Sequence, residues 1–167
     1  MNKTEEQRER FAVLVTEHSR SMYRAARALL PGDADAQDAV GEAVLLAWQS
    51  FEQLRKPEAA RGWLLKITVN CAYSQLRRQS RVVYLEQPEG AAPEDRGDAE
   101  NLWEAVLRLP EDQRLAVTLY YYEDMPVAQI ARTLGIPQGT VKSRLSRGRE
   151  RLRQLLREEE QYGFQEQ

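Results

Sequence analysis

The sequence predicts an all-α protein with two small helical domains joined by a flexible acidic linker. Apolar residues recur at helical spacing through most of the 167 residues, and runs of Val, Ile and Thr with period two are missing. The pattern breaks in "EQPEGAAPEDRGDAE" (86–100), which mixes Pro, Gly and acidic residues. We therefore expect domains at 1–81 and 100–167, separated by a linker at 82–99.

Three helices are expected in the first domain. Thr4 followed by Gln7 fits a capping box at the start of the first helix. "PGDAD" (31–35) ends that helix, and Asp35 is the candidate N-cap of the second. The third helix is "RGWLLKITVNCAYSQLRR" (61–78), which carries apolar residues on one side.

Four helical segments are expected in the second domain. The first covers roughly 99–107, and Pro110 suits the first position of the next helix, "PEDQRLAVTLYYYE". "PVAQIARTL" (126–134) has apolar residues at i, i+3, i+4 and i+7, and a long helix begins near Pro137. The acidic linker before these helices is interpreted as a solvated spacer, with a nucleic-acid mimic lying across a basic surface as the alternative.

The composition argues against an enzyme and against a membrane protein. Hydrophobic residues make up 42% of the chain, charged residues 30%, and the formal net charge is −2. No apolar stretch of about 18 residues and no N-terminal signal pattern are present, so we expect a cytoplasmic protein. His18 fits a plain helix residue, and Cys71 fits a small core residue. No Gly-rich phosphate loop or metal-ligand spacing occurs, so we expect no catalytic residue, metal, cofactor or small-molecule substrate.

Positive charge is concentrated in "TVKSRLSRGRERLR" (140–153), which holds six bases and one acid. This helix follows "PVAQIARTL" after a short turn at Gly135, and two helices joined in this way form a helix-turn-helix. The inner face carries Val141, Leu145, Gly148, Leu152 and Leu155. The outer face carries small polar and basic residues, which suit a surface that enters the DNA major groove.

The two halves together resemble the extracytoplasmic-function class of bacterial sigma factors. The residues that carry this resemblance are "DADAQDAVGEAVLLAWQSF", "RGWLLKITVNCAYSQLRRQSR" and "LPEDQRLAVTLYYYEDMPVAQIARTLGIPQGTVKSRLSRGRERL". The resemblance covers about residues 10–156. It implies a first domain that docks on core RNA polymerase and opens the −10 element, and a second that reads the −35 element. It also implies promoter DNA and an anti-sigma factor as partners.

The resemblance implies three groups of site residues. The polymerase contacts are Asp38, Glu42 and Leu46, while Asp35 serves as a cap and Trp48 as a core residue. The −10 contacts are Lys56, Arg61, Lys66, Asn70, Ser74, Arg77 and Arg78, and the turn at 55–61 helps to hold a flipped base. The −35 base contacts are Lys142, Ser143, Ser146 and Arg147, with Thr140, Arg144 and Arg149 on phosphates.

Three residues depart from the family pattern. Gly41 replaces a residue that is usually a polar helix former, at a cost of about 1 kcal/mol in helix stability. Ser74 and Ser146 also depart from the common residues, which bears on the promoter sequence rather than on the function.

Two other classes of function compete with this interpretation. An autonomous helix-turn-helix regulator would form dimers on palindromic duplex sites without polymerase. A nucleic-acid enzyme would need a carboxylate cluster or metal site in a basic cleft, and the sequence shows neither. The basic helix at 61–78 has no role in the regulator and favours the sigma factor.

Overall fold

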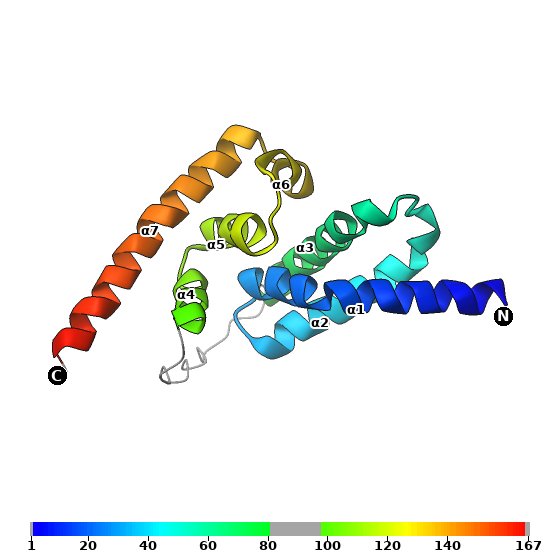
Figure 1. Cartoon of the computed structure of the whole chain (residues 1–167), viewed down its shortest axis with the longest axis horizontal. Coiled ribbons are helices and arrows are strands. Elements are labelled where there is room, and N and C mark those ends of the chain that lie inside the picture. The colour runs from blue at the N-terminus through cyan, green and yellow to red at the C-terminus, as the bar shows by residue number, and fades with distance from the viewer. Residues whose placement is uncertain (1, 81–97, 166–167) are drawn as a thin grey trace.

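The structure, a computed structural model, describes residues 2–80 and 98–165. Every regular element in these ranges is helical, which confirms the all-α prediction. The α-helices in these ranges are, in chain order, α1 (Lys3–Leu29), α2 (Asp33–Gln49), α3 (Ala60–Gln79), α4 (Asp98–Leu107), α5 (Glu111–Val117), α6 (Val127–Leu134) and α7 (Gln138–Gln165). In Figure 1, α1 to α3 lie together on one side of the molecule, and α4 to α7 lie on the other.

The first domain is a bundle of α1, α2 and α3, and each helix packs against the other two. Its interior is rich in alanine. The fully buried alanines are Ala25, Ala26, Ala28, Ala36, Ala39, Ala43, Ala47, Ala60 and Ala72. Because the distance between two packed helices depends on the side chains at their contact, these small residues let the three helices approach closely.

The capping box predicted at the start of α1 is wrong. The helix begins at Lys3, so Thr4 lies inside it, and the N-cap residue Asn2 makes no side-chain capping bond. The Gln7 side chain instead donates to the Glu52 carboxylate at 3.4 Å. A contact with a distant turn therefore replaces the local capping bond that the sequence predicts.

Two other helix starts differ from the prediction, by three residues at α2 and by one residue at α5. The N-cap of α2 is Gly32, and both Asp33 and Asp35 lie in the first turn, so the predicted cap at Asp35 is wrong. Carboxylates in a first turn still suit the positive end of the helix dipole. In the second domain, Pro110 is the N-cap of α5, and the helix begins at Glu111.

The second domain departs from regular α-helix after α5. Where the sequence predicts one continuous helix, the chain forms a π-helical turn at Thr118–Tyr122. The wider turn ends with the Glu123 backbone N–H donating to the Thr118 carbonyl at 3.2 Å. Further on, Gly135 ends α6 in the left-handed conformation with φ of 67°, as its place in the predicted turn requires.

The predicted linker lies mostly outside the described residues. Its last two positions, 98 and 99, belong to α4, so the second domain begins two residues before the predicted boundary. The interpretation of the acidic segment as a solvated spacer stays a prediction.

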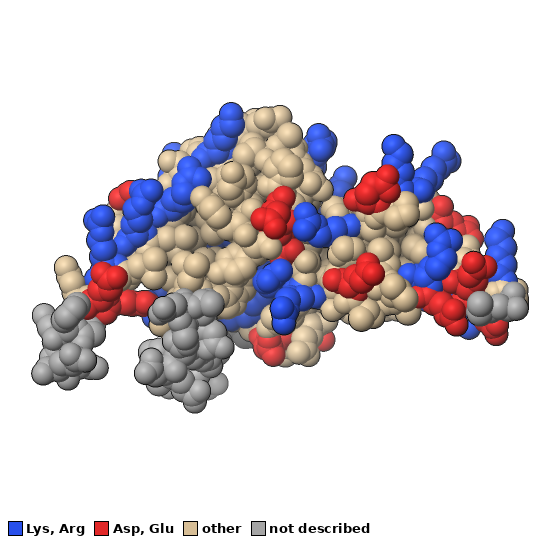
Figure 2. All heavy atoms as spheres, viewed as in Figure 1, with Lys and Arg blue, Asp and Glu red and all other residues tan. Residues whose placement is uncertain are grey.

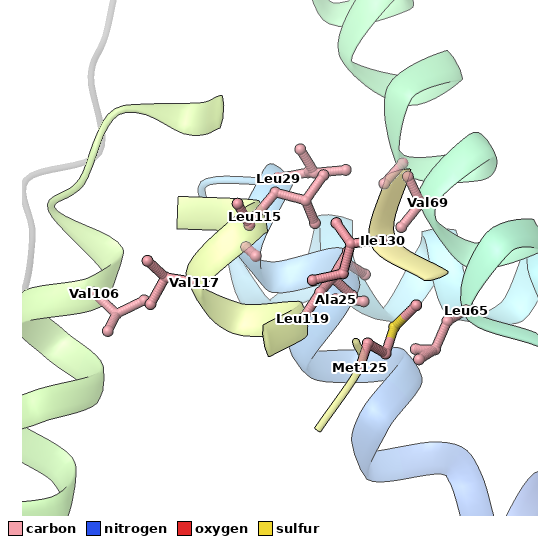
Figure 3. Close-up of a cluster of buried hydrophobic side chains, with 14 of the residues drawn as sticks. Ala25, Leu29, Leu65, Val69, Val106, Leu115, Val117, Leu119, Met125 and Ile130 are labelled. Atoms are coloured by element: carbon pink, nitrogen blue, oxygen red, sulfur yellow. The ribbon is translucent and has the colours of Figure 1, made fainter. Parts of the chain in front are cut away.

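Buried apolar residues form two clusters. The smaller one lies inside the first domain and includes Phe11, Met22 and Leu64. The larger one runs through both domains, from Leu29 and Val69 to region 98–165. Figure 3 shows that side chains from α1 and α3 meet side chains from the second domain in one cluster. The two domains are therefore packed on each other.

Candidate nucleic-acid and polymerase interfaces

The helix-turn-helix consists of α6, the turn at Gly135 and α7. Backbone hydrogen bonds stabilise the first turn of α7: the N–H groups of Thr140 and Val141 donate to the Pro137 carbonyl. The inner face of α7 is buried as predicted at Val141, Leu145, Gly148 and Leu155, and Leu152 is partly buried. At Gly148 an added Cβ would lie 2.7 Å from the Val117 side chain, so glycine lets α7 approach α5.

The outer face of α7 is turned to solvent. Lys142, Ser146 and Arg147 are exposed, and Ser143 is partly exposed. Figure 2 shows Lys and Arg side chains gathered along the edge of the molecule that α7 forms. These are the residue types that contact base edges and phosphates in a major groove.

Four arginines of α7 already have partners in the free chain, including Arg151, which donates to the Gln154 side chain at 3.3 Å. Arg144 lies 3.7 Å from the Asp112 carboxylate, and its side chain is 24% exposed. Arg149 donates to the Tyr121 hydroxyl at 3.1 Å, and Arg153 pairs with Glu150 at 3.1 Å. Arg144 and Arg149 are thus held beside the recognition surface, which suits phosphate contacts that position a helix.

The residues predicted for the −10 element lie on α3 and the turn before it. Lys66, Asn70, Arg77 and Arg78 are exposed, and Ser74 and Arg61 are partly exposed. Arg77 donates to the Ser74 hydroxyl at 3.1 Å. The spacing of Lys66, Asn70, Ser74 and Arg77 places them along one side of the helix.

A hollow lies between α1 and the turn that leads to α3. Its volume is about 410 Å³, and it is lined by Glu9, Arg10, Val13, Leu14, Phe51, Leu54, Arg55 and Pro57. Lys56 is exposed beside it. An aromatic ring and cationic groups around a hollow are what an unstacked base needs for stacking and for charge.

The residues predicted for polymerase binding lie along α2. Asp38 is exposed, and Leu46 is 43% exposed. Glu42 is partly exposed and pairs with Arg78 of α3 at 3.3 Å. Leu45 is 66% exposed but was not predicted as a polymerase contact. Its position next to Leu46 in the sequence could have indicated it.

The placement of Trp48 differs from the prediction of a core residue. Its side chain is 37% exposed. Its ring lies 5.2 Å from the Phe11 ring and 6.2 Å from the Phe51 ring, which forms an aromatic cluster at the end of the bundle. At this end of the bundle α2 packs on one side only. One part of the Trp48 ring is therefore buried against the bundle, as the helical periodicity predicts, and the other part faces solvent.

The remaining candidate for chemistry is Cys71, which is 3% exposed. Burial raises the pKa of the Cys71 thiol to about 11, so the thiol is protonated at neutral pH and is a poor nucleophile. Within residues 2–80 and 98–165, no group of three His, Cys, Asp or Glu side chains could hold a metal ion. In the same ranges no helix combines the length and the apolar character needed to cross a membrane.

Known sequences of one family match this arrangement. The ECF RNA polymerase sigma factor SigM of Mycobacterium tuberculosis is 35% identical over 153 residues, which covers 87% of this chain and 76% of that one. The RNA polymerase sigma factor SigV of Bacillus subtilis is 31% identical and covers 87% of this chain and 90% of its own. The chain belongs to the ECF sigma factors. The family descriptions "Sigma-70 region 2" and "Sigma-70, region 4" match residues 14–82 and 99–152.

Solved structures share the fold of this sigma factor. The sigma factor RpoE in complex with the anti-sigma factor NepR, from Bartonella quintana, has a TM-score of 0.76 at 27% identity and covers 89% of this chain and 98% of that one. CnrH, solved with the cytosolic domain of CnrY, has a TM-score of 0.64 at 23% identity and covers 89% and 88% of the two chains. Because each match covers 89% of this chain, it includes helices of both domains.

Membership of the family decides between the classes of function. Sigma factors bind core RNA polymerase and promoter DNA, and they direct promoter-specific initiation of transcription through regions 2 and 4. They are transcription factors and not enzymes. The sigma factor predicted from the sequence is therefore confirmed, and the autonomous regulator and the nucleic-acid enzyme are set aside.

Proposed function

We propose that this sigma factor divides its work between three surfaces: α7 for the −35 element, α3 with the preceding turn for the −10 element, and α2 for core polymerase. The observation that supports this division most strongly is the pair of faces on α7. One face is buried in its own domain, and the opposite face presents exposed basic and small polar residues. A helix with these two faces can enter a major groove without any loss of domain packing.

On α7, the base contacts are assigned to four residues of the outer face. They are Lys142, Ser143, Ser146 and Arg147, which occupy the first turns of the helix. Thr140, Arg144 and Arg149 contact phosphates, and the hydrogen bond from Arg149 to Tyr121 holds that guanidinium in position. Phosphate contacts set the register of the helix, and base contacts set the preferred sequence.

On the first domain, α3 contacts the melted strand of the −10 element. The contacts are Lys56, Arg61, Lys66, Asn70, Ser74, Arg77 and Arg78. The hollow beside Phe51 and Arg55 accepts a base that leaves the stack.

Polymerase binds the outer side of α2. Asp38 and Glu42 supply negative charge one turn apart, and Leu46 with its neighbour Leu45 supplies exposed apolar surface. Exposed apolar residues flanked by charge are typical of a protein interface. When polymerase engages Glu42, the pair with Arg78 opens and releases that arginine for DNA.

The domain division and the cellular context complete the proposal. Residues 1–81 act as the polymerase and −10 unit, and residues 100–167 act as the −35 unit. The protein works in the cytoplasm, where its polymerase and promoter are found. An anti-sigma factor binds it, an inference supported by the RpoE–NepR likeness.

The test reverses charge on α2. Replacing Asp38 and Glu42 by Lys should reduce affinity for core polymerase by more than about a hundredfold, because like charges that meet across an interface cost several kcal/mol. Affinity is measured by fluorescence anisotropy, and thermal unfolding of the free protein shows whether the fold survives.

The matched control carries Glu158→Lys and Glu160→Lys, which change the net charge by the same amount at two exposed residues of α7. The control should bind polymerase like the parent. Equal affinities of the α2 variant and the control would remove Asp38 and Glu42 from the interface.

A further inference from the structure

The partner of Arg149 on α7 is neutral, unlike the partners of two other arginines of the helix. The Arg144 and Arg153 side chains each face a carboxylate. Arg149 instead donates to the Tyr121 hydroxyl at 3.1 Å. An uncharged hydroxyl orients the guanidinium but neither neutralises its positive charge nor repels an anion that approaches it. Because this bond uses one of the five guanidinium N–H groups, the exposed Arg149 side chain keeps donors for an anion.

Arg149 lies on the side of α7 that carries part of the proposed −35 surface. Lys142, Ser146 and Arg149 follow one another at i, i+4 and i+7, and all three are exposed. Seven residues cover about 10 Å along the helix axis. This length is close to the width of the major groove, which is about 12 Å. When the first turns of α7 lie in the groove, Arg149 is therefore beside the phosphate backbone that borders it.

The π-helical turn fixes the place of Tyr121. Thr118 and Leu119, at the start of this turn, are fully buried. The Met125 backbone N–H donates to the Leu119 carbonyl at 3.0 Å and closes the segment after the turn. The Tyr121 ring also meets the Tyr120 ring edge to face, with 4.9 Å between the ring centres. Turns of this kind are rare and often lie at functional sites. Here the turn presents a tyrosine to the flank of α7.

The Tyr121 hydroxyl can itself bind an anion. A phenolic hydroxyl both accepts and donates a hydrogen bond, and its oxygen accepts from Arg149. Its own hydrogen has no acceptor in the part of the chain that the structure describes. The side chain is 48% exposed, so this hydrogen can reach a group outside the protein. Tyrosine and arginine are both among the side chains that donate to DNA phosphates.

We propose that Tyr121 and Arg149 form one phosphate-binding unit at the edge of the −35 contact. Tyr121 orients the guanidinium through its oxygen and donates its hydrogen to the phosphate that Arg149 binds. This assignment rests on the phosphate contact proposed above for Arg149, and it adds a residue of the π-helical turn to the DNA surface. Because a side chain that is already oriented loses less conformational freedom on binding, the hydroxyl strengthens the arginine contact.

The experiment compares Tyr121→Phe, Arg149→Ala and the double variant. Each full-length protein is assembled with core polymerase. The probe is a fluorescent promoter duplex selected from a random library with the parent holoenzyme, at a temperature low enough to keep the duplex closed. Fluorescence anisotropy gives the affinity at several salt concentrations. Thermal unfolding of each free protein shows whether its fold is intact.

The two single variants should differ in their salt dependence. Arg149→Ala removes a charge from a phosphate, so the slope of log affinity against log salt should fall in magnitude by about 0.9. Tyr121→Phe removes an uncharged group, so the affinity should fall by about threefold to tenfold while the slope stays that of the parent. The preferred −35 sequence should not change, because phosphate contacts carry no sequence information.

The double variant tests whether the two residues act as a unit. In the Arg149→Ala background, Tyr121→Phe should lower the affinity less than in the parent, because the hydroxyl no longer has a guanidinium to orient. A tyrosine that only stabilised the domain would have the same effect in both backgrounds.

Tyr122→Phe is the matched control, because it makes the same chemical change at the next residue. The Tyr122 ring lies 5.1 Å from the Trp103 ring and faces the first domain. There the Arg24 guanidinium lies 5.7 Å from the ring centre and also donates to Glu123 at 2.8 Å. The control should bind the promoter duplex like the parent.

The possible failures are distinguishable. Parent-like affinity and slope in Arg149→Ala would remove the phosphate contact proposed for Arg149 and, with it, the unit. If Arg149→Ala is weakened but Tyr121→Phe matches the Tyr122→Phe control, the proposed contact stands and the unit is overturned. Equal effects of Tyr121→Phe in both backgrounds, or a changed −35 preference, would also overturn it.

Discussion

Helices α3 and α7 carry the same kind of side chain but are built into the molecule differently. Both present basic and small polar residues on an exposed side. The inner face of α7 packs within its own domain, mainly against α5 and α6. In contrast, α3 packs against α1 and α2 on its own side and against α6 of the other domain. The proposed −35 surface on α7 is therefore separate from the interdomain contact, while α3 takes part in that contact.

Arginines that have partners in the free chain occur on both helices. On α7, Arg147 is exposed and has no ion-pair partner among the described residues, whereas Arg144 and Arg149 have partners. On α3, Arg78 pairs with Glu42, and Arg77 donates to Ser74. The proposed DNA contacts of Arg77 and Arg78 would require both side chains to exchange these partners. The two helices therefore differ in their interdomain packing and not in the pairing of their arginines.

Among the variants that test the comparison of α3 with α7, Arg147→Ala on α7 should have the largest effect on promoter activity. A bidentate contact with a base contributes about 1–3 kcal/mol of discrimination, so activity at the preferred promoter should fall by about 5- to 150-fold. A promoter series with single substitutions in the −35 element measures the change in preference. The control is Arg153→Ala, because Arg153 lies farther along α7 and pairs with Glu150. Unchanged preferences in the Arg147 variant would show that this residue does not read bases.

A smaller effect is expected on α3 from Asn70→Ala and Ser74→Ala. Each would remove one proposed hydrogen bond to the melted strand, worth about 1 kcal/mol, so together they should reduce promoter opening by about tenfold or more. Formation of the closed promoter complex should change less, because α7 is intact. Permanganate reactivity of −10 thymines measures opening, and a gel-shift assay measures the closed complex. Parent-like reactivity in both variants would contradict the assignment of α3.

The smallest effects are expected at the glycines of the two helices. Gly148→Ala places a Cβ 2.7 Å from a methyl group of Val117, a buried branched side chain that must shift to accommodate it. Overpacking costs about 1–3 kcal/mol, and the better helix propensity of Ala offsets up to about 1 kcal/mol. A net loss of about 1 kcal/mol in the free energy of unfolding should follow, measured by urea denaturation.

Two other glycines serve as comparisons. Gly62→Ala on α3 meets only the flexible end of the Gln129 side chain, so the stability should change less than in the Gly148 variant. Gly41→Ala on α2 has no neighbour within 4 Å of the added Cβ and should stabilise the protein by up to about 1 kcal/mol. A Gly148 variant that is as stable as the Gly41 variant would show that α5 and α7 can separate without cost.

The sequence by itself determined the helices, the helix-turn-helix and the two faces of α7. Each depends on neighbours within one or two turns. Apolar residues at a spacing of 3.6 define a face wherever the helix is placed, and Gly135 allows the left-handed turn regardless of what packs around it. The family motifs are local in the same sense, because each is a short run of neighbouring residues, and the sequence alone therefore indicates a sigma factor.

Only the tertiary structure decided the closure of the two domains. Arg24 and Glu123 are 99 positions apart, and no periodicity in the sequence links them. The burial of Glu123, the π-helical turn before it and the exposed edge of Trp48 likewise depend on which helices meet. The same apolar stripe can face its own domain or a neighbouring one, because hydrophobic burial has no direction of its own. The partner of each stripe is fixed when the helices pack, and that packing brought α3 against α6.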